Sequence, residues 1–113
     1  MKERRRLLVV GVGSIGERRL RCSQATDRVD ISLCELNADL RQQVAERYSV
    51  KTQYADLDSA LAEPHDFAVI ATPAHLHIQM AQRVVEAGLD VFIEKPLSTS
   101  VDGVADLQKL LKE

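Results

Sequence analysis

Residues 7–16 read LLVVGVGSIG, an apolar run that ends in three glycines with the spacing G-x-G-x-x-G. This spacing is typical of a dinucleotide-binding turn where a buried strand leads into it and a helix follows. Both conditions are met, because the apolar run predicts a strand over 7–12 and residues 15–24 have helical spacing. The stretch therefore predicts the opening strand, turn and helix of a Rossmann-type α/β fold.

Each glycine of this turn has a predicted physical role. Gly11 permits the tight turn, Gly13 lets the backbone approach a pyrophosphate, and Gly16 allows the helix to pack closely against the sheet. The backbone N–H groups of Ser14 and Ile15 are expected to face the phosphates, where the helix dipole favours an anion. The turn is therefore a candidate phosphate-binding site.

Two acidic residues have predicted roles around the turn. Glu35 ends the second apolar run, about 20 residues beyond the glycines, where a carboxylate accepts hydrogen bonds from the adenosine ribose. Because a carboxylate there repels a 2′-phosphate, NAD is favoured over NADP, although Asn37 and Arg41 are near enough to soften that preference. Glu17 stands three residues after Ser14, the spacing of a capping box, so a purely structural role for Ser14 is an alternative.

Short apolar runs alternate with helical stretches along the whole chain, which predicts a doubly wound, mostly parallel sheet with strand order 3-2-1-4-5. Helix ends are predicted at an N-cap of Asp56 or Asp58 and at Gly88, a residue suited to the position after a helix. The expected strands cover residues 7–12, 29–35, 52–54, 67–71 and 91–93, and the expected helices cover 15–24, 38–48, 57–62, 78–87 and 101–112.

A complete fold of this kind would add a sixth strand, so residues 1–113 are expected to be a truncated dinucleotide-binding domain of a longer protein. The edge that the sixth strand would cover is then open. An open edge favours pairing with a second copy, and a homo-oligomer is expected.

Composition excludes several classes of protein. Fifteen basic and seventeen acidic side chains give a formal charge of -2, which argues against binding of nucleic acid through its phosphates. The longest apolar run is far shorter than the roughly 20 residues of a membrane helix. Cys22 and Cys34 lack metal-ligand spacing, so they are expected to be buried, reduced thiols in a cytoplasmic protein, and no metal site is predicted.

Two further clusters follow the fourth and fifth predicted strands. Residues 71–77 read ATPAHLH, and residues 91–97 read VFIEKPL. Both stand at the carboxyl ends of strands, on the sheet edge that carries the glycine turn, where ligands of open α/β folds bind. Thr72 also suits a helix N-cap and Pro73 a first helical turn, so a structural role for this pair is an alternative.

The joint occurrence of GVGSIG, Glu35, a T-P-x-x-x-H motif and an E-K-P motif resembles the N-terminal domain of the Gfo/Idh/MocA oxidoreductase family. The resemblance covers nearly the whole chain. It implies NAD or NADP as cofactor and substrates such as sugars, polyols and their acids. Arg19 departs from the family, which often has histidine after the glycine turn, so it could add positive charge near the phosphates or face solvent.

The resemblance also implies roles for the two later motifs. Thr72, Pro73 and His77 would line the nicotinamide side of the cofactor, and Glu94 would lie near the nicotinamide ribose. Lys95 would be the catalytic residue that contacts the reacting hydroxyl and assists its proton loss. A lysine buried beside a positively charged nicotinamide has its ammonium form disfavoured, which moves its pKa toward the working range.

Two functions are therefore weighed. In the first, the chain is the cofactor-binding part of an oxidoreductase that moves hydride to or from a hydroxyl-bearing carbon of a small molecule, and by itself it binds cofactor without turnover. In the second, it is a non-catalytic nucleotide-binding or regulatory module that acts with a partner. Substrate specificity is expected to come from a further domain.

Overall fold

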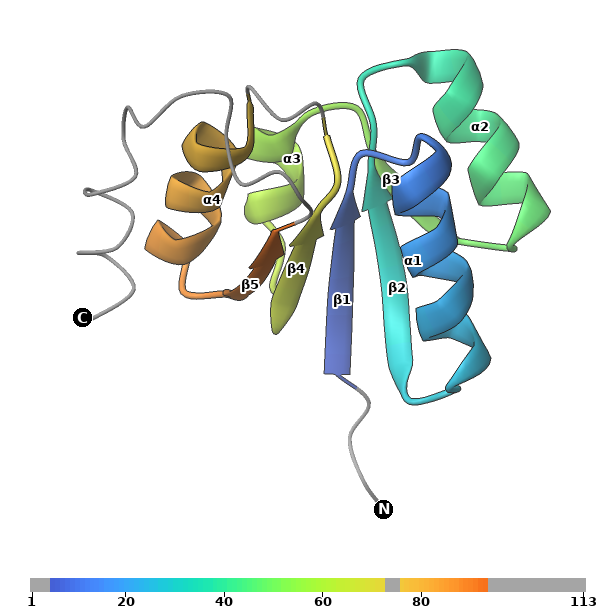
Figure 1. Cartoon of the computed structure of the whole chain (residues 1–113), viewed down its shortest axis with the longest axis horizontal. Helices are drawn as coiled ribbons and strands as arrows, with labels where there is room; N and C mark the ends of the chain where they lie inside the picture. Colours follow the sequence, from blue (N-terminus) through green and yellow to red (C-terminus); the bar gives the residue numbers. More distant parts are fainter. Residues whose placement is uncertain (1–4, 73–75, 94–113) are drawn as a thin grey trace.

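The computed structural model describes residues 5–72 and 76–93, and their elements alternate strictly between strand and helix (Figure 1). The expected helix over 101–112 and the candidate site residues Pro73, Glu94 and Lys95 lie outside the described residues. The elements are β1 (Arg5–Val10), α1 (Ser14–Ala25), β2 (Val29–Cys34), α2 (Ala38–Arg47), β3 (Thr52–Tyr54), α3 (Leu57–Leu61), β4 (Phe67–Ile70), α4 (His77–Glu86) and β5 (Asp90–Ile93).

The strands form one parallel sheet in the order β3-β2-β1-β4-β5, which confirms the predicted topology. The register aligns the strand ends, because Val10 pairs with both Cys34 and Ile70, and Ile70 pairs with Ile93. The residues that follow β1, β2 and β4 therefore leave the sheet at one common edge, toward which the arrows of Figure 1 point.

The helices cover both faces of the sheet, and the hydrophobic core is divided accordingly. Leu7 and Val9 of β1 belong to a cluster that is covered by α1 and α2. Leu8 and Val10 alternate with them and belong to a second cluster, covered by α3 and α4. All four side chains are at most 1% exposed, which explains why β1 reads as a continuous apolar run rather than an alternating one.

Backbone geometry sets the ends of several elements. β1 ends at Val10, two residues before the predicted end, because Gly11 turns the chain with a φ of +86°. β2 ends at Cys34, one residue early, and leaves Glu35 beyond the strand. Gly88, with a φ of +89°, follows the C-cap of α4 as predicted. Asp56 is the residue that caps α3, through a 2.7 Å hydrogen bond that its carboxylate accepts from the Ser59 N–H.

One expectation about the cysteines is wrong. Cys34 is buried at the end of β2, but Cys22 is exposed on α1. Cys22 is not packed because the buried side of α1 is formed by Gly16 and Leu20. Over the ranges 5–72 and 76–93, no helix has the length and apolar character needed to cross a membrane.

Candidate functional site

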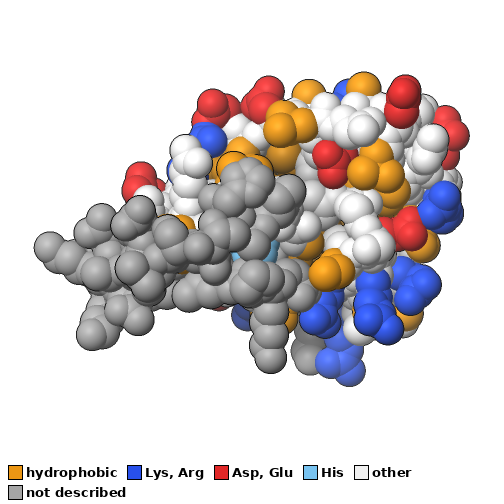
Figure 2. All heavy atoms as spheres, turned by 45° about the horizontal axis from the view of Figure 1, so that its top comes forward, with side chains coloured by type: hydrophobic (Ala, Val, Ile, Leu, Met, Phe, Trp, Pro, Cys, Tyr) orange, Lys and Arg blue, Asp and Glu red, His pale blue; other side chains and the backbone are white. Residues whose placement is uncertain are grey.

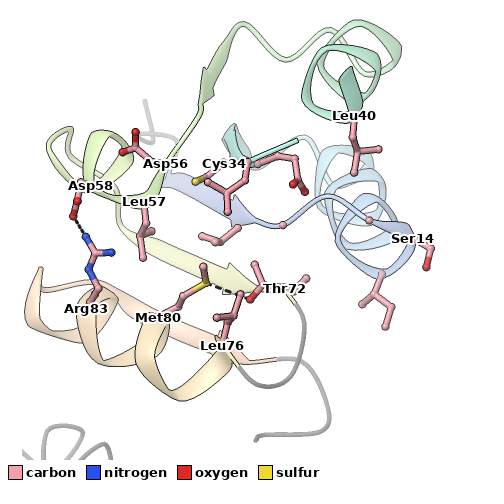
Figure 3. A pocket seen from close by; sticks show the side chains of 17 residues that line it. Ser14, Cys34, Leu40, Asp56, Leu57, Asp58, Thr72, Leu76, Met80 and Arg83 are labelled. Carbon is pink, nitrogen blue, oxygen red and sulfur yellow. Dashed lines mark hydrogen bonds and ion pairs between the residues drawn. The ribbon is translucent and has the colours of Figure 1, made fainter. Parts of the chain in front are cut away.

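A cavity of about 690 Å³ opens at the sheet edge where β1, β2 and β4 end (Figure 3). Figure 3 places Ser14 and Leu40 on one side of the cavity and the residues of α3 and α4 on the other. The described residues that line it are Val10, Gly11, Gly13, Ser14, Ile15, Cys34, Glu35, Leu36, Leu40, Asp56, Leu57, Asp58, Ala71, Thr72, Leu76, Met80 and Arg83. The cavity thus brings together the glycine turn, Glu35 and Thr72, which lie far apart in the sequence.

The three glycines of the turn meet different surroundings. A Cβ on Gly16 would lie 1.8 Å from the Gly11 carbonyl oxygen, so α1 approaches the turn as closely as only glycine permits. A Cβ on Gly11 would lie 2.9 Å from the Thr72 backbone nitrogen. Gly13 has an ordinary φ of -64°, and a Cβ there would meet nothing within 4 Å. Gly11 and Gly16 are required by the fold, whereas no contact among the described residues requires Gly13.

The N-terminus of α1 is left without a side-chain cap. Gly13 is the N-cap residue, whereas α2 and α3 are capped by the side chains of Asn37 and Asp56. The capping box considered for Ser14 is not formed, because Gly13 rather than Ser14 is the N-cap residue; Glu17 makes an ion pair with Arg47 of α2. The first N–H groups of α1 lie beside the cavity, and a helix N-terminus of this kind favours an anion.

Glu35 is held in place by backbone N–H groups. Its Oε1 atom accepts a 3.0 Å hydrogen bond from the Val12 N–H, and its Oε2 atom accepts a 3.0 Å bond from the Asn37 N–H. A carboxylate has about four acceptor positions, so each oxygen keeps capacity for a ligand hydroxyl. The carboxylate therefore lines the cavity in a fixed orientation and ties the turn after β2 to the glycine turn.

Thr72 lines the cavity, but His77 does not. The Thr72 hydroxyl donates to the Met80 sulfur at 3.3 Å, and the Thr72 carbonyl oxygen lies 2.6 Å from Nε2 of His77. His77 is 1% exposed and is not among the residues that line the cavity. Thr72 is not the N-cap of α4 either, since that helix begins at His77 with Leu76 at its N-cap.

The charge around the cavity is predominantly acidic. Glu35, Asp56 and Asp58 line it, and among its described lining residues Arg83 is the single basic side chain and is paired with Asp58 (Figure 3). Figure 2 shows hydrophobic and acidic side chains on the face seen there, with most of the visible Lys and Arg side chains at the lower right. An anion in this cavity would therefore be bound mainly by backbone N–H groups.

Two arginines of interest lie away from the cavity lining. The Nη1 atom of Arg41 donates to the Glu35 backbone carbonyl at 2.9 Å, which holds the Arg41 guanidinium near the N-terminus of α2. Arg19 lies over the ring of Phe92 on β5, with 5.2 Å between the guanidinium carbon and the ring centre. Arg19 is exposed and is not among the described residues that line the cavity.

Cys34 is a buried residue that lines the cavity, but it is poorly suited to act as a nucleophile. Burial, reinforced by the nearby carboxylates of Asp56 and Glu35, raises its pKa to about 11. The thiol therefore stays protonated at neutral pH, and it is the thiolate that reacts. Among residues 5–72 and 76–93, no group of three His, Cys, Asp or Glu side chains is placed to hold a metal ion.

Sequence reasoning missed one wall of the cavity. Leu57, Met80 and Arg83 belong to α3 and α4, where they appear in the sequence only as members of ordinary helical patterns. Leu36 carries a clearer signal, because it is an apolar residue directly after Glu35 and is 72% exposed in the structure. An exposed leucine beside a candidate ligand-binding carboxylate marks a surface that a ligand can cover.

Comparison with known proteins identifies the family and the fold. A family model described as "Oxidoreductase family, NAD-binding Rossmann fold" matches residues 5–113. The chain is 32% identical over 110 residues to 4-carboxy-2-hydroxymuconate-6-semialdehyde dehydrogenase of Sphingobium sp., covering 96% of this chain and 34% of that protein. It is 36% identical over 103 residues to an inositol 2-dehydrogenase/D-chiro-inositol 3-dehydrogenase of Shouchella clausii, covering 87% and 30%.

The fold of this chain also matches that of a solved structure. The fold superimposes on GenD2 from gentamicin A biosynthesis, solved in complex with NAD, with a TM-score of 0.89 and 32% sequence identity. The match covers 99% of this chain and 32% of GenD2. The chain thus spans about a third of the length of these relatives.

Proposed function

This chain belongs to the Gfo/Idh/MocA oxidoreductase family with its NAD-binding Rossmann fold, and on that basis we propose that it binds NAD in the cavity above the glycine turn. The observation that carries the proposal is the convergence of three strand ends on one cavity. Gly13 and Ser14 follow β1, Glu35 follows β2 and Thr72 follows β4. Ligands of open α/β sheets bind at such an edge.

The residues present fit the chemistry of a dinucleotide. The uncapped N-terminus of α1 offers N–H donors to the pyrophosphate, and the open space beside Gly13 lets that group come close. Glu35 can accept hydrogen bonds from ribose hydroxyls through lone pairs that its backbone partners leave free. Ile15 is 48% exposed and Leu36 is 72% exposed at the rim, which gives apolar surface for the ligand to cover.

We further propose NAD rather than NADP as the cofactor. A 2′-phosphate would lie against the fixed Glu35 carboxylate, and Arg41, the nearest candidate to neutralise it, is engaged with the Glu35 carbonyl. Two like charges at close range disfavour each other. The acidic lining of the cavity supports the same preference.

The proposed reaction is hydride transfer between the nicotinamide and a hydroxyl-bearing carbon of a sugar, a polyol or a related small molecule. The cofactor, when bound, supplies the hydride chemistry. Lys95 would take the proton from the reacting hydroxyl. It follows β5, which ends at Ile93 in register with Ile70, two residues before Thr72.

Pro73 and Glu94 complete the proposed cofactor contacts by their position in the T-P-x-x-x-H and E-K-P motifs. Because the chain spans about a third of its relatives, we expect these 113 residues alone to bind cofactor without turnover. We also propose that the protein is cytoplasmic and assembles as a homo-oligomer. Light scattering of the purified protein would test the assembly, and Phe92, half exposed on β5, is the apolar side chain that supports it.

Calorimetric titration with NADH and NADPH tests the cofactor proposal, using Glu35→Gln and the control Asp39→Ala. Glu35→Gln removes the charge while an amide oxygen can still accept from the Val12 N–H. A charge-assisted hydrogen bond contributes about 1.5–3 kcal/mol, so NADH affinity should fall roughly ten- to hundredfold while NADPH affinity rises. Asp39 is exposed on α2 outside the cavity lining, so its replacement should change neither.

Failure of the folded native chain to bind either dinucleotide would contradict the proposed cofactor site. Binding of NADPH as tightly as NADH, unchanged in Glu35→Gln, would retain the site but contradict the preference for NAD. A response of Asp39→Ala as large as that of Glu35→Gln would mean that overall charge, rather than contact with the ribose, governs affinity.

A further inference from the structure

His77, the first residue of α4, contacts the backbone of Thr72 after β4, a contact that the sequence motif does not reveal. His77 is 1% exposed, and its Nε2 atom lies 2.6 Å from the Thr72 carbonyl oxygen. Because a carbonyl can only accept, Nε2 must carry the proton and donate it. The Nε2–H group of His77 therefore donates to the backbone carbonyl of Thr72.

Thr72 is held by α4 at two points. His77 binds its carbonyl, and Met80, one helical turn further on, accepts from its hydroxyl at 3.3 Å. Residues three apart share one face of a helix, so both contacts come from the same side of α4. Thr72 lines the cavity between α4 and the glycine turn.

Ala71 and Thr72, which follow β4, also contact the end of β1 and the glycine turn. Ala71 donates its backbone N–H to the Val10 carbonyl at 2.8 Å, which fastens the start of the turn to the end of β1. A Cβ on Gly11 would lie 2.9 Å from both the backbone nitrogen and Cγ2 of Thr72. The position of Thr72 therefore determines how much room the glycine turn has.

We propose that His77 is a positioning residue, which shapes the cofactor site by fixing Thr72 against Gly11 and does not touch the cofactor itself. This inference rests on the proposed cofactor site. It assigns to His77 a role different from the nicotinamide contact that its place in the motif implies. Loss of the hydrogen bond frees the Thr72 carbonyl and lets the turn move relative to Gly11.

The chain provides a matched control in a second histidine. His65 Nε2 lies 2.9 Å from the Ala60 carbonyl oxygen, also five residues earlier in the sequence. It is partly buried between α3 and β4 and is not among the residues that line the cavity. Replacing His65 removes the same kind of bond without touching the glycine turn.

The test compares His77→Leu, His77→Gln and His65→Leu in the 113-residue chain by NADH titration. His77→Leu should weaken NADH binding about tenfold or more, which is about 1.4 kcal/mol. His77→Gln, whose amide N–H can replace the Nε2 donor, should restore affinity to within about threefold of the native chain. His65→Leu should lower the thermal midpoint but leave NADH affinity unchanged.

Two measurements on the cofactor-free protein separate this inference from the proposed function. The ¹⁵N spectrum of the His77 ring should show a protonated Nε2 atom, and the backbone amide signals of residues 11–13 should move in His77→Leu but not in His65→Leu. If native protein binds no NADH while these shifts occur, the proposed function fails and the positioning role stands. An unprotonated Nε2, unmoved amides, or equal NADH affinity in His77→Leu and native protein would overturn the inference. The ring spectrum of native protein applies even if His77→Leu does not fold.

Discussion

Alanine at Gly13 and alanine at Gly16 should differ in their effect on stability, although both glycines belong to one turn. The Cβ of Gly16→Ala would lie 1.8 Å from the Gly11 oxygen and 2.8 Å from the Gly11 carbonyl carbon. Both are backbone atoms, which cannot rotate away as a side chain can. An ordinary carbon–oxygen contact is about 3.3 Å, so α1 and the turn must separate by roughly 1.5 Å.

That separation disturbs packing at the centre of the fold. Overpacking a well-packed site costs typically 1–3 kcal/mol and occasionally more, and we expect Gly16→Ala to lie at or above about 3 kcal/mol. For a domain of this size, that loss corresponds to a fall in Tm of roughly 10–20 °C. Between the lowered Tm and the Tm of the native chain, the variant should bind no NADH because it is unfolded there.

Gly13→Ala should leave stability nearly unchanged. Its φ of -64° and ψ of -169° suit any residue, and the new Cβ would meet nothing within 4 Å. Alanine is a poorer N-cap than glycine but also restricts the unfolded chain, and these effects nearly cancel to within about 1 kcal/mol. Because the methyl group occupies space proposed for the pyrophosphate, NADH affinity should fall at least about tenfold.

Thermal unfolding by circular dichroism and NADH titration by fluorescence measure both quantities for both variants. The reasoning about the fold is refuted if Gly16→Ala unfolds at the same temperature as the native chain. Unchanged NADH affinity in a folded Gly13→Ala variant would refute the contact between the turn and the dinucleotide.

Two further predictions concern titratable side chains. Cys22 is exposed, whereas burial raises the pKa of Cys34 to about 11, so iodoacetamide at pH 8 should modify Cys22 alone in native protein. Equal modification rates at both cysteines, measured by mass spectrometry, would contradict the buried position of Cys34. Burial, partly offset by the hydrogen bond to Ala60, lowers the pKa of His65 below its ordinary value of about 6.5. The unfolded chain therefore binds a proton at this residue more readily than the folded chain does. The contribution of His65 to stability is present above about pH 6.5 and is lost as the pH falls from the unfolded-state pKa to the folded-state pKa. Urea denaturation at pH 7.5 and pH 5.5 should therefore show a smaller acid-induced loss for His65→Gln than for the native chain, and an equal loss in both would show that His65 is not the titrating group.

Local rules accounted for much of the fold. Continuous burial of β1, the left-handed position at Gly88 and the N-cap of α3 follow from residue type and spacing, and the structure contains all three. The sequence predicts the end of β1 two residues late, because Val12 is as apolar as Val9 and Val10. Only the positive φ of Gly11 reveals where the strand stops.

The site was less predictable where it depends on contacts between distant segments. The sequence places Glu35 at a strand end, but it does not show that Val12 and Asn37 fix both of its oxygens. A motif likewise marks His77 without showing whether its ring faces a ligand or the backbone. That choice depends on how α4 packs against the turn after β4.

The sequence by itself determined the glycine turn, the order of the strands and the acidic residue that follows β2, because these depend on apolar periodicity and on the steric freedom of glycine. Only the tertiary structure decided which glycine the fold requires and which it leaves open, since that is a matter of what lies within a few ångströms of each Cβ position. It also decided that α3 and α4 supply a wall of the cavity, because their lining residues meet the glycine turn only after the right-handed crossovers have placed those helices on the opposite face of the sheet from α1.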